Sequence, residues 1–249
     1  AAALVTGNTV LAKPSEHTSL IGYKAISLFF DHGLPPNALH FLPGDGKLGQ
    51  AIISSQHIDL VVFTGSFKTA KKIQQSLSNK PGKIVPLIAE TSGLNSMVVD
   101  SSALVERACD DIIRSAFNSA GQRCSALRLL LVHEEIYGEV IPMLKGMMDE
   151  LIIGSPDDPS VDIGPIISTD SVQNLNNYLK KDDPARENIY QVELSKNLKD
   201  NWFAPTLIEM SSIDNIVEEQ FGPILHVIPF ADDNLDAFLT KVDGKGFAL

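Results

Sequence analysis

The stretch DLVVFTGSFKTAKKIQQSLSNKPGKIVPLIAE, residues 59–90, decides the fold. It opens with the apolar run DLVVFTG (59–65) and closes with a second one, IVPLIAE (84–90). The residues from Ser66 to Leu77 between them predict a helix. Two strands joined through one helix form a parallel pair with a right-handed crossover. This stretch therefore predicts an α/β fold with a parallel sheet.

The same alternation continues upstream of this unit. TVLAK (9–13) and ALHFLPG (38–44) are expected to be strands. Between them, a helix is predicted from Thr18 to His32, because its apolar residues recur at helical spacing and Gly33 can end it. The residues that share its apolar face are Leu20, Ile21, Ala25, Leu28 and Phe29.

Downstream, NSMVVD (95–100) and LRLLLVH (127–133) read as further strands. An amphipathic helix between them is expected to begin after Ser102 as its N-cap, with Leu104 among the inward residues. WFAPTLIEM and ILHVIPF are late strands, and the polar stretch 180–201 is interpreted as a surface excursion. A domain boundary is predicted near residues 89–93, at the Gly93 turn.

Composition excludes several functional classes. The chain has 249 residues and a formal charge of -11, so it carries no basic footprint for nucleic acid or for an anionic membrane. No uncharged apolar run reaches the roughly 18 to 20 residues that span a bilayer. Six scattered histidines and two cysteines predict neither a metal site nor a disulfide framework. The cysteine usage favours a reducing compartment, and we expect a cytoplasmic protein.

Cys124 is the candidate nucleophile. It lies in NSAGQRCSALR (118–128), a small, polar segment between an amphipathic helix and a buried strand, where a loop can present a thiol. The neighbouring Arg123 would favour the thiolate. Free cysteines are more often small buried hydrophobic residues, and that interpretation suits Cys109 on its apolar helix. From context alone, both interpretations remain open for Cys124.

Glu90 is the candidate general base. It ends the strand IVPLIAE, and the carboxyl ends of parallel strands are where open α/β sheets bind ligands. A carboxylate in that place can take a proton from water. An exposed acid at the end of a strand, with no further role, is the alternative.

Two junctions are candidates for nucleotide contacts. Gly65 and Ser66 form a strand–turn–helix junction whose backbone amides can hold an anion, although Ser is also an ordinary N-cap. Lys13 and Glu16, in KPSE, follow a strand end and can hydrogen-bond the hydroxyls of a ribose; a solvated pair is the alternative. Glu219, in EEQFGPIL, is either another ligand contact or a plain acid at the end of a helix.

Taken in order, the motifs KPSE, LPGDG, FTGS, AETSG, GQRCSA and EEQFGP resemble the aldehyde dehydrogenase superfamily over essentially the whole chain. Glu90 and Cys124 lie 34 positions apart, which fits the interval between base and nucleophile in that family. The resemblance implies a Rossmann-type, parallel-sheet NAD-binding part, residues 1–89, and an α/β catalytic domain, residues 90–249. Both are expected to be incomplete.

The resemblance also implies a mechanism. Cys124 would attack the aldehyde to give a thiohemiacetal, which passes a hydride to NAD(P), and Glu90 would activate the water that hydrolyses the resulting thioester. The backbone N–H of Cys124 would be part of an oxyanion hole. The positions that match the family's cofactor contacts are Lys13, Glu16, Gly44, Gly65, Ser66, Glu219 and Phe221. The negative charge of Glu16 would repel a 2′-phosphate, which favours NAD over NADP.

Within the superfamily, PLIAETSGLNSMVVDSSAL and SAFNSAGQRCSALR are similar to the pyrroline-5-carboxylate dehydrogenase branch, and most of all to the dehydrogenase part of bifunctional bacterial proline-utilisation enzymes. The branch implies L-glutamate γ-semialdehyde as substrate, with Ser125 and Arg123 as substrate-binding residues. It also implies a proline dehydrogenase domain with its own FAD in the same parent chain, and a homo-oligomeric parent.

Both ends of the chain look cut, and the resemblance implies functional segments beyond them. The family's oxyanion-hole asparagine would lie before Ala1, and the loop that anchors the substrate carboxylate would follow Leu249. We therefore expect little activity from these residues alone. Three alternatives stay open: a dehydrogenase for another semialdehyde such as succinate semialdehyde, a module that retains only nucleotide binding, and a thioesterase-like hydrolase that uses Cys124 and Glu90 without a cofactor.

Overall fold

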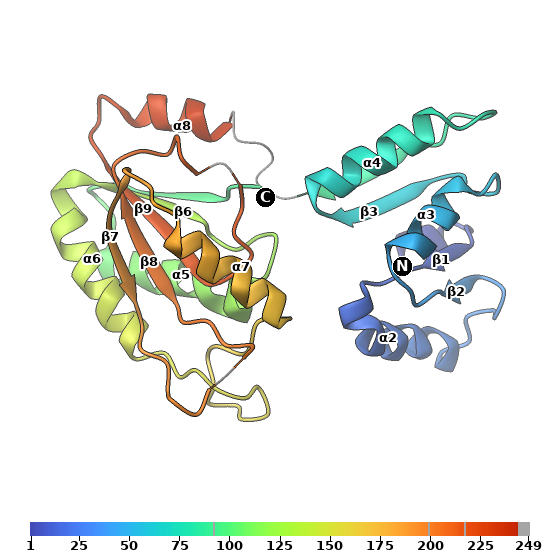
Figure 1. The fold of residues 1–249 in the computed structure, drawn as a ribbon, viewed down its shortest axis with the longest axis horizontal. Coiled ribbons are helices and arrows are strands. Elements are labelled where there is room, and N and C mark those ends of the chain that lie inside the picture. Colours follow the sequence, from blue (N-terminus) through green and yellow to red (C-terminus); the bar gives the residue numbers. More distant parts are fainter. Residues whose placement is uncertain (92, 199, 217, 244–249) are drawn as a thin grey trace. The chain divides into compact units, whose positions relative to one another are not determined.

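The computed structural model describes residues 1–91, 93–198, 200–216 and 218–243, which form two compact units, Ala1–Glu90 and Thr91–Leu249 (Figure 1). The division falls within the range 89–93 where the sequence places a domain boundary. The α/β architecture with parallel strands expected from the sequence is confirmed by parallel strand pairs that alternate with helices.

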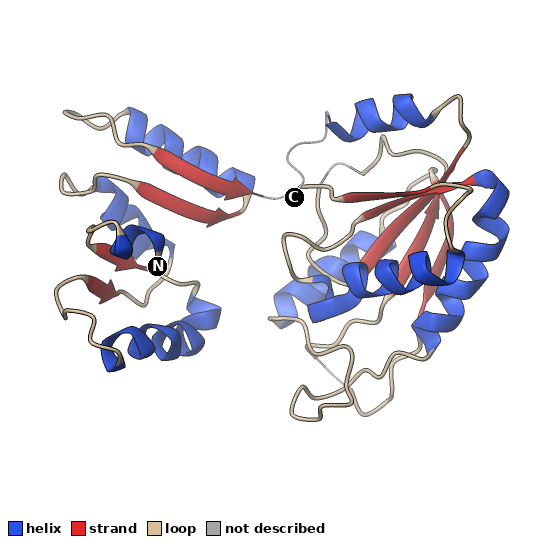
Figure 2. Ribbon diagram, turned by 180° about the vertical axis from the view of Figure 1, so that it is seen from behind, coloured by secondary structure: helices blue, strands red, loops and turns tan. Residues whose placement is uncertain are grey.

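The first unit holds two pairs of short strands. β1 and β2 are parallel, with Val10 opposite Leu39. β3 and β4 are neighbours in a second sheet, joined through α4, and Figure 2 shows their arrows pointing the same way. The elements are α1 (Ala2–Val5), β1 (Val10–Ala12), the 3-10 turn η1 (Glu16–Thr18), α2 (Ser19–Asp31), β2 (Leu39–Phe41), α3 (Gly46–Ser54), β3 (Val61–Gly65), α4 (Phe67–Ser78) and β4 (Leu87–Thr91).

Burial in the first unit is limited. Its main cluster is formed by Ile73 and Leu77 of α4 together with Val85. No residue of α2 is buried, and the apolar face that the sequence assigned to this helix remains exposed at Leu20 and Ile21. The helical periodicity is therefore present, but little within this unit covers it.

The second unit is built on one five-stranded sheet, in the order β5-β6-β9-β8-β7. Every neighbouring pair is parallel except β7 and β8, which are antiparallel. The elements are β5 (Ser96–Val99), α5 (Val105–Phe117), the 3-10 turn η2 (Asn118–Gly121), β6 (Leu129–His133), α6 (Glu134–Asp149), α7 (Thr169–Lys180), β7 (Arg186–Gln191), β8 (Thr206–Met210), β9 (Ile224–Phe230) and α8 (Leu235–Asp243).

The core of this unit lies around β6, whose five residues are all buried. Helices α5 and α6 contact each other, α6 contacts β6 and β9, and α5 contacts β9. Cys109 of α5 has no exposed surface, which confirms the prediction that its thiol is a buried core group. The continuous apolar run of β6 is typical of a central parallel strand, and that strand leads directly out of the Cys124 segment.

One local prediction was wrong and another was incomplete. Ser102 does not cap α5: its hydroxyl donates to Asp100, and the N-cap of the helix is Leu104, which is 70% exposed rather than inward. The polar stretch 180–201 lies largely at the surface, as expected, but it also contains the strand β7. An edge strand has only one strand neighbour, so it tolerates the polar composition that concealed it.

None of the described helices has the length and apolar character that a membrane crossing requires.

Candidate active site

Cys124 lies on an exposed turn between η2 and β6. The turn is closed by a hydrogen bond from the backbone N–H of Ala126 to the carbonyl of Arg123, at 3.1 Å, which leaves Cys124 and Ser125 at its two central positions. All three residues from Arg123 to Ser125 are exposed. Cys124 is thus presented on a short turn that is closed by a backbone hydrogen bond.

The chain reaches this turn through strained backbone. Ser119, Ala120 and Gly121 have φ angles of 55°, 53° and 64°, in the left-handed region that costs a non-glycine residue about 1–2 kcal/mol. At Gly121 a Cβ atom would lie 2.2 Å from the carbonyl oxygen of Gly222, so no other residue fits without moving backbone. Strain of this kind persists only where the surroundings enforce it.

The next residue, Gln122, ties the turn to a neighbouring loop. Its amide nitrogen donates to the carbonyl of Pro165 at 3.1 Å, and its amide oxygen accepts from the N–H of Ile167 at 2.8 Å. Both ends of the side-chain amide are therefore used on the same loop, which fixes the segment immediately before Cys124.

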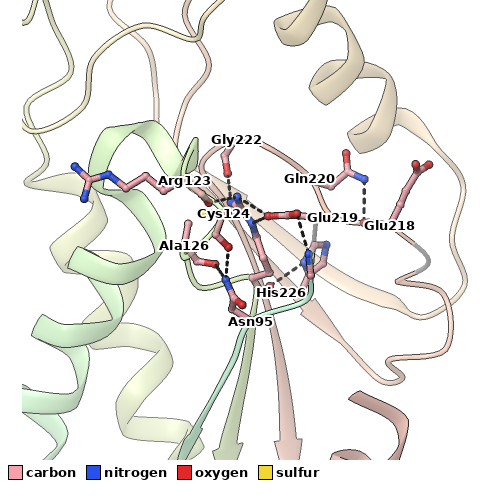
Figure 3. A network of polar contacts seen from close by, with 11 residues as sticks. Asn95, Arg123, Cys124, Ala126, Glu218, Glu219, Gln220, Gly222 and His226 are labelled. Carbon is pink, nitrogen blue, oxygen red and sulfur yellow. Dashed lines mark hydrogen bonds and ion pairs between the residues drawn. The ribbon is translucent and has the colours of Figure 1, made fainter. Parts of the chain in front are cut away.

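Asn95 holds the turn from below (Figure 3). Its side chain is buried, and its amide nitrogen donates to the carbonyl of Cys124 at 2.6 Å and to that of Ala126 at 3.0 Å. The backbone carbonyl of Asn95 accepts from the N–H groups of Arg128 and Leu129 at 3.0 and 3.1 Å, which joins the start of β5 to the start of β6.

Arg128 is the largest polar group in the core, with a side chain 1% exposed. Its guanidinium donates to the carbonyl of Arg123 at 3.0 Å, to the carbonyl of Gly222 at 3.0 Å and, through two nitrogens, to one carboxylate oxygen of Glu219 at 3.1 Å. The ring of Phe221 lies 5.2 Å from the guanidinium carbon. One side chain thus joins the nucleophile turn to the 219–222 segment.

Glu219 is as deeply buried as its partner, with a side chain 3% exposed, and its second oxygen accepts from the N–H of Gly93 at 3.2 Å. Burial raises the pKa of this carboxyl, while Arg128 and the Gly93 N–H oppose the change. Burial likewise lowers the pKa of Arg128, opposed first by Glu219 and also by the nearby Cys124. Two charges this far from water persist because each neutralises the other.

Sequence reasoning missed Asn95 and Arg128, although both stand in stretches it identified as strands. The available signal was a polar residue at the start of an otherwise apolar run, NSMVVD and LRLLLVH. From the sequence, Arg123 was expected to act through its charge. In the structure, the backbone carbonyl of Arg123 accepts a hydrogen bond from Arg128, and the side chain of Arg123 extends away from the cluster (Figure 3).

The candidates of the first unit lie at strand ends. The amine of Lys13 donates to the carbonyls of Gly44 and Pro14, at 2.6 and 2.8 Å, just after β1. Glu16 begins η1 and is exposed. The structure therefore connects Lys13 to Gly44, two residues that the sequence had assigned to cofactor binding separately.

Ser66 is the N-cap of α4, and its hydroxyl accepts from the N–H of Thr69 at 3.3 Å. In the described part of the chain the N–H groups of Phe67 and Lys68 have no hydrogen-bond acceptor, so the helix begins with free donors and the positive end of its dipole. A Cβ at Gly65, just before it, would meet the Phe63 ring at 2.6 Å, so a side chain there would require that ring to shift. This terminus suits an anion.

Glu90 is exposed near the end of β4 and belongs to the first unit, whereas Cys124, Ser125, Glu219 and Phe221 belong to the second. Glu219 and Phe221 also border a cavity of about 490 Å³ whose other walls are α7, Lys181, Glu218 and Gln220. Across residues 1–91, 93–198, 200–216 and 218–243, no group of three or more metal-ligating side chains comes together.

Known proteins resemble this chain along nearly its whole length. The model of the aldehyde dehydrogenase family matches residues 1–245. Among curated proteins, the bifunctional protein PutA of Klebsiella aerogenes is 39% identical; the match covers all of this chain and 20% of that protein. The chain thus spans about a fifth of the length of the PutA relatives that it matches.

Solved structures agree. Proline utilization A of Bradyrhizobium japonicum superposes with a TM-score of 0.94 at 40% identity, over 100% of this chain and 25% of that one. A 1-pyrroline-5-carboxylate dehydrogenase from Thermus, solved with bound NAD, gives a TM-score of 0.82 at 30% identity, over 91% of this chain and 45% of that one.

Proposed function

The chain belongs to the aldehyde dehydrogenase family, and on this premise we propose that its protein oxidises L-glutamate γ-semialdehyde to L-glutamate with NAD as the hydride acceptor. One observation carries the proposal: the thiol of Cys124 is exposed on a turn whose two flanking carbonyls are held by buried side chains. The names of the relatives, PutA and 1-pyrroline-5-carboxylate dehydrogenase, support this choice of substrate.

Cys124 is the proposed nucleophile. Its thiolate adds to the aldehyde carbon, which forms a carbon–sulfur bond and places the negative charge on the former carbonyl oxygen. The N–H of Cys124 makes no hydrogen bond among the described residues, so it is free to donate to that oxygen. NAD, when bound, supplies the acceptor for the hydride that leaves the same carbon, and a thioester remains on Cys124.

Glu90 is the proposed base of the second step. It takes a proton from water as that water attacks the thioester carbon, and the Cys124 thiolate leaves with the electrons of the carbon–sulfur bond. Exposure near the carboxyl end of β4 gives Glu90 access to water, which the role requires.

The first unit offers groups that fit a dinucleotide. The free N–H groups at the start of α4, with Gly65 beside them, suit its pyrophosphate. Lys13 and Glu16 are proposed to hold the adenosine ribose, where the charge of Glu16 disfavours the 2′-phosphate of NADP. We accordingly assign residues 1–89 to cofactor binding and residues 90–249 to catalysis.

In the second unit, Glu219 is proposed to bind the nicotinamide ribose and Phe221 to pack near the nicotinamide. Phe221 is 44% exposed and accessible. Among the described residues, the second oxygen of Glu219 accepts one hydrogen bond, from the N–H of Gly93, so a lone pair remains on it for a ribose hydroxyl. Ser125 is proposed to contact the substrate carboxylate, and Arg123 to favour it through its charge.

The parent is proposed to carry a proline dehydrogenase domain with FAD, as the bifunctional PutA relatives suggest, and to be a cytoplasmic homo-oligomer. Succinate semialdehyde remains the runner-up substrate. Steady-state formation of NADH by the intact protein separates the two: we expect a higher kcat/KM for glutamate γ-semialdehyde, and a preference for succinate semialdehyde would reverse the assignment.

Glu90→Gln tests whether Glu90 acts in hydrolysis of the thioester and not in hydride transfer. The amide cannot take a proton from water, so the thioester should accumulate: a rapid burst of NADH close to one per site, then steady turnover slower by about 10²-fold or more. Full steady-state turnover without a burst would remove Glu90 from the mechanism. Binding of NAD with no NADH formation from any aldehyde would instead favour the binding-module alternative, and thioester cleavage with no need for NAD would favour the thioesterase alternative.

A further inference from the structure

We propose that Asn95 and Arg128 are positioning residues that hold the two peptide groups flanking Cys124, and thereby aim the Cys124 N–H at the substrate oxygen. The inference rests on the proposed function, because it takes the oxygen of a bound aldehyde or ester as the target of that N–H. Neither side chain is among the residues that react; both act through the backbone of the nucleophile.

The first peptide group joins Arg123 to Cys124. Its oxygen accepts from the guanidinium of Arg128 at 3.0 Å and from the N–H of Ala126 at 3.1 Å. The described chain contains no cis peptide bond, so the N–H of Cys124 points opposite to this oxygen in the same rigid plane. Fixing the oxygen therefore fixes the direction of the N–H. A charged donor on the oxygen also polarises the peptide, which strengthens the N–H as a donor.

The second peptide group joins Cys124 to Ser125. Its oxygen accepts from the amide of Asn95 at 2.6 Å, and the same nitrogen reaches the carbonyl of Ala126 at 3.0 Å. With the peptide planes on both sides of its Cα fixed, Cys124 has little freedom left in φ or ψ. The Cα–Cβ bond that carries the thiol then keeps a constant relation to the N–H.

Both positioning residues are anchored independently of the turn. Arg128 is held by Gly222 and Glu219, and its backbone N–H bonds to the carbonyl of Asn95. The carbonyl of Arg128 accepts from the N–H of His226 at 3.0 Å, and the His226 ring lies within hydrogen-bond distance of it, at 3.1 Å. The base of the turn is therefore part of the sheet core, whereas its tip, Cys124 and Ser125, is exposed.

Asn95→Asp in the intact protein is the principal test. The carboxylate has the shape of the amide but offers an acceptor to the two carbonyls that need a donor. We expect kcat per active site to fall by about 10²-fold at pH 8, comparable to losing an oxyanion donor or misplacing it by roughly 1 Å, with little change in KM for the aldehyde.

The pH profile separates positioning from a merely structural role. Burial raises the pKa of a carboxyl, and its protonated form can donate to the Cys124 carbonyl. The ratio of variant to wild-type kcat should therefore rise several-fold between pH 8 and pH 6. A ratio that stays near one at every pH overturns the proposal, as does a loss of rate that does not respond to pH.

Arg128→Lys provides the second variant, which carries the test if Asn95→Asp does not fold. Lysine keeps the charge beside Glu219, but a single ammonium cannot span the carbonyls of Arg123 and Gly222 together with the carboxylate. We expect a roughly tenfold loss of kcat. The matched control is Arg114→Lys on α5, an exposed arginine that should leave the rate unchanged.

A second reaction distinguishes failure of this proposal from failure of the proposed function. Acylation of Cys124 by p-nitrophenyl acetate also develops an oxyanion at this turn, yet needs no NAD. If the wild type is acylated but oxidises no aldehyde, the proposed function falls, and the acylation rates of Asn95→Asp and Arg128→Lys still decide the positioning role. Variant acylation rates within twofold of wild type, or a wild type that cannot be acylated, overturn it.

Discussion

The two units of this chain organise their candidate site residues in opposite ways. In the second unit, strained backbone at residues 119–121 leads into the Cys124 turn, a buried ion pair contacts that turn, and the turn is bonded to the starts of β5 and β6. In the first, Lys13 bonds to the carbonyl of Gly44 and Ser66 accepts from Thr69, both just after short strands, in a unit whose buried cluster is small. Rigidity is thus concentrated on the residue proposed to form a covalent bond, while groups proposed to bind a flexible cofactor are left with free donors.

The two cysteines give the largest effect that can break this comparison. Cys124→Ala should lower aldehyde oxidation by at least about 10³-fold while NAD affinity stays near wild type, because the nucleophile is lost and the first unit is untouched. Cys109→Ala is the control: that thiol has no exposed surface, and burial raises its pKa to about 11, so it does not react.

For Cys109→Ala we expect unchanged kcat and a loss of stability of about 1 kcal/mol from the small cavity it leaves. Steady-state NADH assays and thermal melts measure both variants. Retained activity in Cys124→Ala would show that the turn held by Asn95 and Arg128 has a role other than covalent catalysis.

The buried ion pair gives the next effect. Arg128→Met leaves Glu219 3% exposed and without its cation, which typically costs about 3–5 kcal/mol. The comparison in the first unit is Lys83→Met, which removes the exposed ion pair with Asp59 and should change stability little. Denaturant unfolding gives the free energies, and hydrogen exchange should show faster opening of β6 in Arg128→Met alone. Equal losses in the two variants would remove the distinction between the units.

The sequence located most elements because their signals are local. Strand runs such as DLVVFTG and LRLLLVH were predicted from a few adjacent apolar residues, and the turn around Cys124 from its small polar neighbours. The network beneath the turn was not predictable in this way. Arg128 and Glu219 are 91 positions apart, and Asn95 and Cys124 are 29 apart, so each contact exists only once β5, β6 and the 219–222 segment are assembled.

Contacts that are not visible in the local sequence also explain why the helix cap at Ser102 was wrongly predicted and why β7 was missed. Ser102 has the chemistry of an N-cap, but its N–H and its hydroxyl both donate to Asp100 in a local turn, and the helix begins later, at Val105. The stretch that contains β7 has the composition of a loop, and its strand character comes from pairing with β8, which lies further along the chain. The roles of Glu90, Lys13, Glu16 and Ser66 stay predictions that rest on chemistry and family resemblance.

Acidification should weaken the second unit more than the first. Burial lowers the pKa of His226 from 6.5 to about 4, and its neutral ring lies 2.7 Å from the Tyr178 hydroxyl. The unfolded chain therefore binds a proton that the folded unit resists, so stability is full above about pH 6.5 and falls as the pH drops toward 4. The loss amounts to roughly 3 kcal/mol.

Unfolding free energies at pH 7 and pH 4.5 measure this loss, with His226→Gln as the matched variant. Glutamine can still bond to Tyr178 but cannot take up a proton, so its stability should change less over the same window. Hydrogen exchange of β9 against that of α4 assigns the effect to a unit. An identical pH response in wild type and His226→Gln would place the acid sensitivity elsewhere.

The smallest effect is expected at Gly33, just beyond the end of α2 in the first unit. Its φ of +87° is left-handed, but a Cβ added there would have nothing within 4 Å. Gly33→Ala therefore carries a conformational cost alone, about 1 kcal/mol, with no steric term and no effect on kcat. Gly121 beside the nucleophile turn has the same handedness, at φ +64°, but its Cβ would meet the Gly222 backbone at 2.2 Å.

The stability of Gly33→Ala is measured by urea unfolding, and its activity by NADH formation under saturating substrate. A loss of activity in that variant, or a loss of stability as large as that of Gly121→Ala, would mean that the first unit is as tightly constrained as the second, and the contrast between them would fail.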